Sequence, residues 1–151
     1  MLINPDKVPD KTGTNYPEPF KHLVAGRIRK RLGNAAGLTN FGVNLVTLQP
    51  GAWSSIRHWH SKQDEFIYII EGEVTLVTDA GQEVLESGDM AGFPAGEAEG
   101  HHLVNDSNSI VRYLEIGART TNDRVIYPDT DLVAKSSPDG WAFTRKDGSN
   151  F

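Results

Sequence analysis

Apolar and polar residues alternate with a period of two in several short segments of the chain. The clearest of these segments are residues 42–48, 66–70, 73–78 and 110–117, and turn residues separate them at spacings of roughly 8–12 residues. Successive side chains of a β-strand point to opposite faces, so each segment can bury one face and expose the other. No long stretch keeps the stripe of a helix. The pattern predicts an all-β fold of short strands joined by hairpin turns.

These half-buried strands need a cover for their apolar faces. A closed barrel or a two-sheet jelly roll provides it and also protects the sheet edges. The length of 151 residues suits one domain with a substantial core. We therefore expect a single domain, residues 1–151, with a barrel core at about 27–117. The flanking segments, 1–26 and 118–151, are rich in Pro, Asp and Gly and are predicted to be arms that wrap the barrel or cross to a partner subunit.

The segment before the first clear strand has two readings. Residues 19–32 can form a short helix, whereas 26–33 can form a strand. In the strand, Arg27, Arg29 and Arg31 share one face. A solvated sheet edge, or pairing with acidic residues of a partner chain, is the preferred explanation of this basic face. The alternative is a contact to an acidic substrate.

Composition limits the classes of partner and of metal site. The chain has no cysteine, so a metal must be held by nitrogen and oxygen ligands. The net charge of −5 argues against binding to nucleic acid. No segment approaches the ~20 apolar residues that cross a bilayer, and the polar, proline-broken start does not resemble a signal peptide. We expect a cytoplasmic protein with a small-molecule ligand and no nucleic-acid or membrane partner. Residues 1–33 are expected to pack across the interface of a homodimer.

Two histidines one residue apart form the strongest candidate site. In a strand, His58 and His60 would point to the same side while Trp59 points to the other. Neutral imidazoles are common ligands of transition metals, and Glu65 would add charge and a third ligand. A further histidine could come from the segment HHLVN, residues 101–105. Taken alone, so short and common a pair is more often a pair of exposed loop histidines followed by a solvated glutamate.

The surrounding residues resemble the two signatures of the cupin superfamily. The stretch GAWSSIRHWHSKQDEFIYIIEG, residues 51–72, contains a glycine, the HxH pair, a glutamate after four further residues and a glycine after six more. The stretch GDMAGFPAGEAEGHHLVN, residues 88–105, contains a glycine, PxG, and a histidine that three intervening residues separate from an asparagine. Both are in the family's order. The resemblance, to small bacterial single-domain cupins, implies the double-stranded β-helix of a cupin jelly-roll barrel.

The resemblance also implies a metal site with four protein ligands. The ligands carried over by position are His58, His60, Glu65 and His101. His101 has the family's spacing to Asn105, but the loop before it is two residues longer than usual, which leaves His102 as the alternative. Asp64 is the corresponding rival of Glu65, and the spacing to the following glycine favours Glu65.

Three imidazoles and one carboxylate leave two open positions on a six-coordinate ion. The ion implied is one divalent transition metal, and Fe, Mn, Ni, Co and Zn all suit these ligands. Because imidazole binds metal only when neutral, acid should release the ion below about pH 6. The implied function is a metal-dependent enzyme on a small organic substrate, with dioxygenase or isomerase/lyase chemistry. The alternatives are a non-catalytic small-molecule-binding or sensor cupin and a metal-free barrel.

Overall fold

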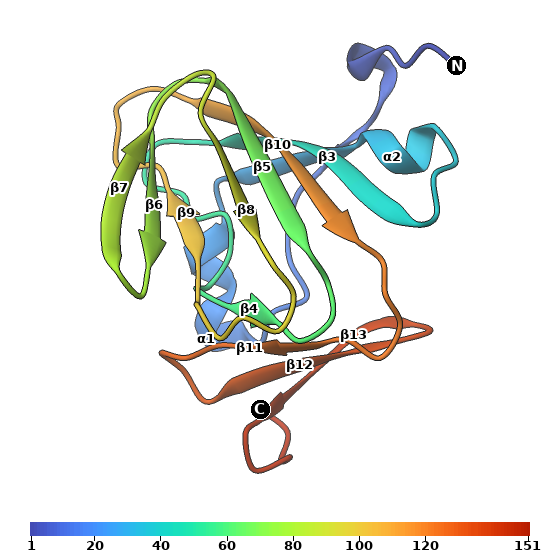
Figure 1. The fold of residues 1–151 in the computed structure, drawn as a ribbon, viewed down its shortest axis with the longest axis vertical. Helices are drawn as coiled ribbons and strands as arrows, with labels where there is room; N and C mark the ends of the chain where they lie inside the picture. Colours follow the sequence, from blue (N-terminus) through green and yellow to red (C-terminus); the bar gives the residue numbers. More distant parts are fainter.

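The computed structural model describes residues 1–151 and consists mainly of antiparallel strands in three sheets (Figure 1). The six-stranded sheet has the order β1 (Asp10–Lys11), β2 (Arg27–Arg31), β3 (Phe41–Leu48), β10 (Val111–Ala118), β5 (Glu65–Glu71) and β8 (Met90–Phe93). The three-stranded sheet has the order β7 (Gly81–Leu85), β6 (Val74–Thr78) and β9 (His102–Val104). The four-stranded sheet has the order β13 (Gly140–Arg145), β12 (Leu132–Ser137), β11 (Arg124–Ile126) and β4 (Trp59–His60). The all-β prediction is confirmed.

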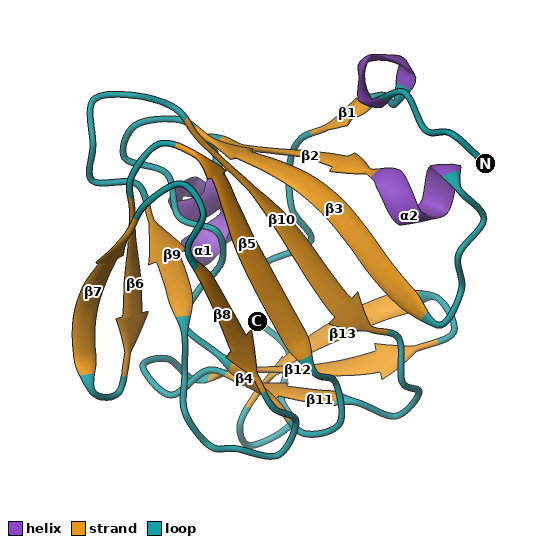
Figure 2. Ribbon diagram, turned by 45° about the horizontal axis from the view of Figure 1, so that its top comes forward, coloured by secondary structure: helices purple, strands orange, loops and turns teal.

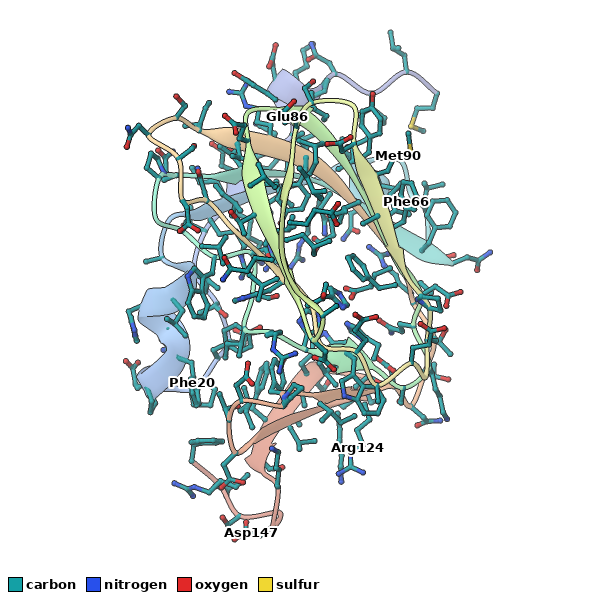
Figure 3. The ribbon with its side chains drawn as sticks, turned by 60° about the vertical axis from the view of Figure 1, so that its left-hand side comes forward. Phe20, Phe66, Glu86, Met90, Arg124 and Asp147 are labelled. Atoms are coloured by element: carbon teal, nitrogen blue, oxygen red, sulfur yellow. The ribbon has the colours of Figure 1, made fainter.

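The main core lies between the six-stranded and the three-stranded sheets. Alternate residues of the strands point into it, as period-two patterning requires. Its buried members include Leu48, Ile69, Val74, Leu103, Val111 and Tyr113. The opposite faces point outward, and Phe66 and Met90, which are 39% and 58% exposed, mark the outer face of β5 and β8 (Figure 3). The two sheets therefore form the predicted barrel.

The order of pairing differs from a simple succession of hairpins. Strands β6 and β7 do form one, with Thr78 opposite Gly81. Strand β5, however, pairs with β10 and β8, while β6 pairs with β7 and β9. The chain leaves one sheet for the other at Gly72, which has φ +86° and whose Cβ, if present, would lie 2.6 Å from the carbonyl oxygen of Ile110. Only glycine fits this crossing, and the predicted hairpin between residues 66–70 and 73–78 is wrong.

Both readings of residues 19–32 apply, each to a different part. The helical turns α1 (Glu18–Lys21) and η2 (His22–Val24) come first, and β2 begins at Arg27. Two further short helices, η1 (Pro5–Lys7) and α2 (Leu32–Ala35), flank this region. No helix of the structure has both the length and the apolar character that a membrane span requires.

The C-terminal segment supplies the third sheet. Strands β11, β12 and β13 lie across one end of the barrel (Figure 2), and β11 pairs with β4 through Val125 opposite His60. A second apolar cluster joins this sheet to the N-terminal segment and to the loop before β4. Its buried members are Tyr16, Val24, Ile56, Val125, Tyr127, Leu132 and Ala134. Both flanking segments thus pack against the barrel, and the homodimer stays a prediction.

Candidate metal centre

The residues predicted to bind metal come together where the barrel meets the C-terminal sheet. His60 lies in β4, Glu65 begins β5, and His58 forms an isolated bridge with His101 through backbone hydrogen bonds of 3.1 and 2.9 Å. The possible ligand atoms of His58, His60 and Glu65 all lie within 4.8 Å of one another. The local spacing of the HxH pair and the short loop to β5 therefore bring two imidazoles and one carboxylate to a single point.

The carboxylate of Glu65 is the centre of this group. Its Oε2 lies 3.4 Å from His58 Nε2 and 2.7 Å from His101 Nε2, and its Oε1 lies 3.3 Å from His60 Nε2. Burial opposes its ionisation, but the surrounding histidines outweigh burial and hold the pKa of Glu65 well below its usual value. Glu65 is therefore an anion in a protected position, as a metal ligand must be.

The outer nitrogens of the two HxH imidazoles are held by the protein. His58 Nδ1 lies 2.8 Å from the carbonyl oxygen of Ile56, and His60 Nδ1 lies 2.6 Å from Oδ2 of Asp123. These acceptors place a proton on Nδ1 and leave Nε2 facing Glu65. Partners of this kind orient metal-binding histidines in proteins. The arrangement fits a divalent transition metal, because two imidazole nitrogens and a carboxylate converge within 4.8 Å of one another.

Asp123 was missed by sequence reasoning. It is fully buried, and its Oδ1 accepts hydrogen bonds from the Ser61 hydroxyl and, at 2.7 Å, from the Lys62 backbone N–H. It therefore fixes the segment after His60 as well as the imidazole itself. The residue lies 63 positions beyond His60 and belongs to no recognisable motif, so no signal in the sequence could have found it.

Of the two adjacent histidines, His101 faces the cluster. Its Nε2 lies 2.7 Å from Glu65, and its ring stacks on Phe93 with centroids 3.6 Å apart and planes within 3°. His101 Nδ1 is buried without a hydrogen-bond partner. Its position suits a fourth ligand, and that assignment stays a prediction.

The two rival residues point away from the cluster. His102 Nδ1 lies 2.9 Å from the carbonyl oxygen of Ser55, and its ring meets the edge of Trp53 at 4.7 Å between centroids. Asp64 Oδ1 accepts a hydrogen bond of 2.8 Å from the backbone of Ala95. Both side chains therefore have structural partners of their own.

Acid is expected to release the metal at a higher pH than that of an ordinary histidine. Burial alone would lower the pKa of His60, but its hydrogen bonds to Asp123 and Glu65 raise that pKa to about 9. A metal must displace this proton, so affinity should fall about tenfold for each pH unit below that pKa and level off above it. Calorimetric titration with Mn²⁺ at pH 7 and pH 8 measures the difference. Equal Mn²⁺ affinities at pH 7 and pH 8 would contradict this predicted dependence on pH.

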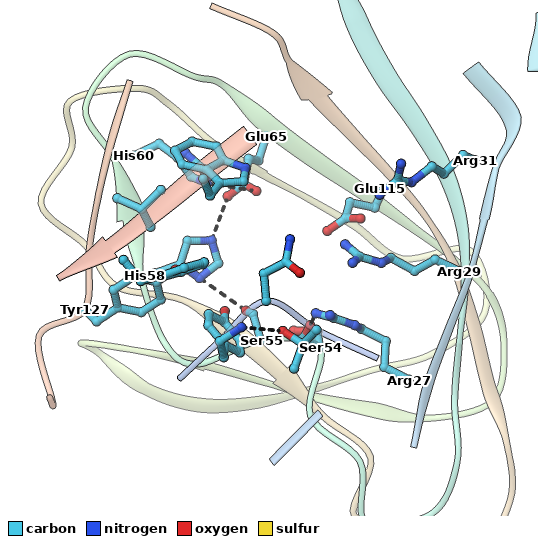
Figure 4. A pocket seen from close by; sticks show the side chains of 16 residues that line it. Arg27, Arg29, Arg31, Ser54, Ser55, His58, His60, Glu65, Glu115 and Tyr127 are labelled. Atoms are coloured by element: carbon cyan, nitrogen blue, oxygen red, sulfur yellow. Dashed lines mark hydrogen bonds and ion pairs between the residues drawn. The ribbon is translucent and has the colours of Figure 1, made fainter. Parts of the chain in front are cut away.

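The cluster forms one wall of a half-open cavity of about 250 Å³. The face of β2 that carries Arg27, Arg29 and Arg31 lines the same cavity, on the side opposite the histidines (Figure 4). Arg27 is only 7% exposed. The solvated-edge reading of this face is thus wrong for Arg27, and the alternative, a contact to an acidic substrate, stays a prediction. Glu115 and Tyr127 also line the cavity.

Comparison with known proteins identifies relatives of the whole chain. The family model of the cupin domain matches residues 44–117. A sugar phosphate isomerase of the cupin superfamily from Silicibacter pomeroyi is 43% identical over 100% of this chain and 96% of its own, with a TM-score of 0.97. A proposed sugar phosphate isomerase from Acidithiobacillus ferrooxidans is 30% identical over 83% of this chain and 80% of its own, with a TM-score of 0.75.

More distant relatives share the fold alone. The polyketide cyclase RemF from Streptomyces resistomycificus is 20% identical over 80% of each chain, with a TM-score of 0.66. No curated protein matches the sequence. The barrel, the two sequence signatures and the relative that matches the full length agree with one another. The protein therefore belongs to the cupin superfamily.

Proposed function

We propose that the protein is a metal-dependent isomerase that acts on a small sugar phosphate. The observation that carries the proposal is that the cluster of His58, His60 and Glu65 lines a concave polar cavity rather than a flat surface. The volume of about 250 Å³ is slightly below that of typical small-molecule pockets, which favours a small substrate. The likeness to the sugar phosphate isomerase of Silicibacter pomeroyi supports the reaction class.

Isomerisation of a sugar needs groups that carry protons. The reaction moves a carbonyl group between neighbouring carbons, so one carbon is oxidised as the other is reduced and no external oxidant takes part. A base removes a proton from one carbon and returns it to the next, while another group moves a proton between the two oxygens. Carboxylate and phenol side chains at the cavity wall are suited to these two tasks.

Glu115 and Tyr127 supply these two groups in the proposal. Oε2 of Glu115 accepts a hydrogen bond of 3.1 Å from the Asn44 amide, which orients the carboxylate as a base. Burial, followed by the neighbouring phenol of Tyr16, raises the pKa of Tyr127 well above its usual value. Tyr127 therefore stays protonated and can donate to a substrate oxygen.

The metal would be held by the four residues predicted from the sequence. These residues are His58, His60, Glu65 and His101. The bound ion would act as a Lewis acid that polarises the substrate oxygens. The chain's own contribution is to fix the imidazoles of His58 and His60 through Ile56 and Asp123.

Turnover of small aldose and ketose phosphates tests the function. With Fe(II), Mn(II), Ni(II), Co(II) and Zn(II) added in turn, we expect isomerisation that a chelator abolishes and one metal restores. Glu115→Gln should lower kcat by about 10²- to 10⁴-fold, the usual contribution of a positioned base, with little change in KM. Stoichiometric binding of the phosphates without turnover would instead indicate a binding or sensor cupin. A protein that retains none of the five metals would contradict the proposal.

A further inference from the structure

The arginine row of β2, Arg27, Arg29 and Arg31, gives one side of the cavity a concentrated positive charge. Alternation places the three side chains on the face of β2 that lines the cavity. Lys30, on the opposite face, reaches Asp10 at 3.0 Å and the carbonyl oxygen of Val8 at 2.8 Å. Lys30 therefore has a carboxylate and a carbonyl partner, whereas the three arginines face the cavity.

The arginine row has no ion-pair partner within the protein. The ion pairs formed by lysine and arginine involve Lys21, Lys30, Arg57 and Arg112. Arg27 donates only to the carbonyl oxygen of Ser54, at 2.5 Å, which fixes its guanidinium at the cavity wall. Glu115 also lines this part of the cavity, and Asn44 donates to its carboxylate. Three positive charges against one negative charge leave a net attraction for an anion.

The buried positive charge of Arg27 is costly unless an anion compensates it. Guanidinium groups present planar pairs of N–H donors that match the oxygens of phosphate. Arginines two positions apart on a strand are separated by about 6.6 Å at their Cα atoms, so their long side chains can approach one phosphate group from two directions. The row suits a phosphate dianion better than a neutral hydroxyl group.

We propose that the arginine row is the subsite that binds the phosphate group of the substrate, while the reacting carbons lie against the histidine cluster. The inference rests on the proposed function, because it assigns one end of the substrate to each side of the same cavity. Arg27 and Arg29 hold the phosphate, and Arg31, which is more exposed, attracts it from solvent. The distance from phosphate to metal then selects the length of the substrate.

Binding of inorganic phosphate to the full-length protein tests this subsite without a sugar. Calorimetry is carried out in the presence of EDTA, so that phosphate cannot bind through a metal. We expect saturable binding that weakens as salt rises. Arg29→Gln should weaken it at least tenfold, and Arg29→Lys should weaken it less because the charge remains. Arg124→Gln is the matched control, since Arg124 points outward from β11 (Figure 3), and it should bind like the wild type.

The outcomes separate this proposal from the proposed function. Wild-type affinity in a folded Arg29→Gln protein, verified by circular dichroism, would overturn the subsite, and so would an equal loss in Arg124→Gln. Metal binding and isomerase activity are measured on the same samples. Phosphate binding that depends on Arg29 in a protein without isomerase activity would support the subsite and contradict the proposed function. Isomerase activity toward sugar phosphates that is unchanged by the Arg29 substitution would support the proposed function and contradict the subsite.

Discussion

Replacing His60 with alanine is expected to abolish stable metal binding and leave the barrel folded. The substitution removes the imidazole whose Nε2 faces Glu65 at 3.3 Å and whose Nδ1 is held by Asp123. The affinity should fall by more than the roughly 10- to 100-fold that loss of an outer partner costs. The fold should persist because the main core lies between two other sheets. Elemental analysis after dialysis measures occupancy, and thermal unfolding measures stability.

His102→Ala is the matched control for that experiment. It also removes a buried imidazole, but one that contacts Ser55 and Trp53 instead of Glu65. Losing this hydrogen bond costs about 1–3 kcal/mol of stability, while metal occupancy should stay at the wild-type value. Loss of metal in His102→Ala with retention in His101→Ala would show that the wrong histidine had been assigned. Full occupancy in His60→Ala would remove the case for the site.

Asp123→Asn is expected to weaken metal binding about 10- to 100-fold although Asp123 does not face the metal position. An asparagine can present its NH₂ group to the Nδ1–H of His60, and both of these groups are hydrogen-bond donors. The clash disfavours the tautomer with a proton on Nδ1, which is the one that leaves Nε2 free to bind a metal. Removal of the negative charge should also lower the pKa of His60 from about 9 in the metal-free protein. Competition with a chelator measures the affinity, and NMR titration measures the pKa.

The change of pKa distinguishes positioning from simple loss of structure. Asp129→Asn removes a carboxylate that pairs with Arg57 at the surface, and it should leave both the affinity and the His60 titration unchanged. An Asp123→Asn protein with the wild-type His60 pKa and wild-type metal affinity would show that the hydrogen bond has no role at the site. Equal effects of both substitutions would point to a general loss of charge instead.

The parts of the site that depend on local spacing could be predicted from the sequence. His58 and His60 share a face because residues two apart in an extended chain do so, and Glu65 follows at the start of the next strand. The same alternation placed His101 and His102 on opposite sides, which the structure bears out in their contacts. These features need only a few neighbouring residues to be extended.

The features that could not be predicted depend on which strands become neighbours. Asp123 reaches His60 because β11 pairs with β4, a pairing between segments that no sequence pattern links. The shared face of the arginine row followed from alternation, but its direction, inward or outward, depends on how β2 lies in the sheet. The predicted hairpin after β5 failed for the same reason, since β6 joins the opposite sheet.

The late position of the C-terminal sheet in the chain sets the order in which the site is completed. The ribosome makes the four predicted ligands, His58, His60, Glu65 and His101, before it makes β11. Asp123, the carboxylate that pairs with His60, directly precedes β11 and is therefore also made later. At roughly 5–20 residues per second, a ribosome adds Asp123 several seconds after His60. A nascent barrel therefore presents its imidazoles before the group that orients one of them. With the proposed metal site, a chain interrupted before β11 would hold a metal weakly even with its barrel formed. The final strands would then decide when the protein could retain an ion.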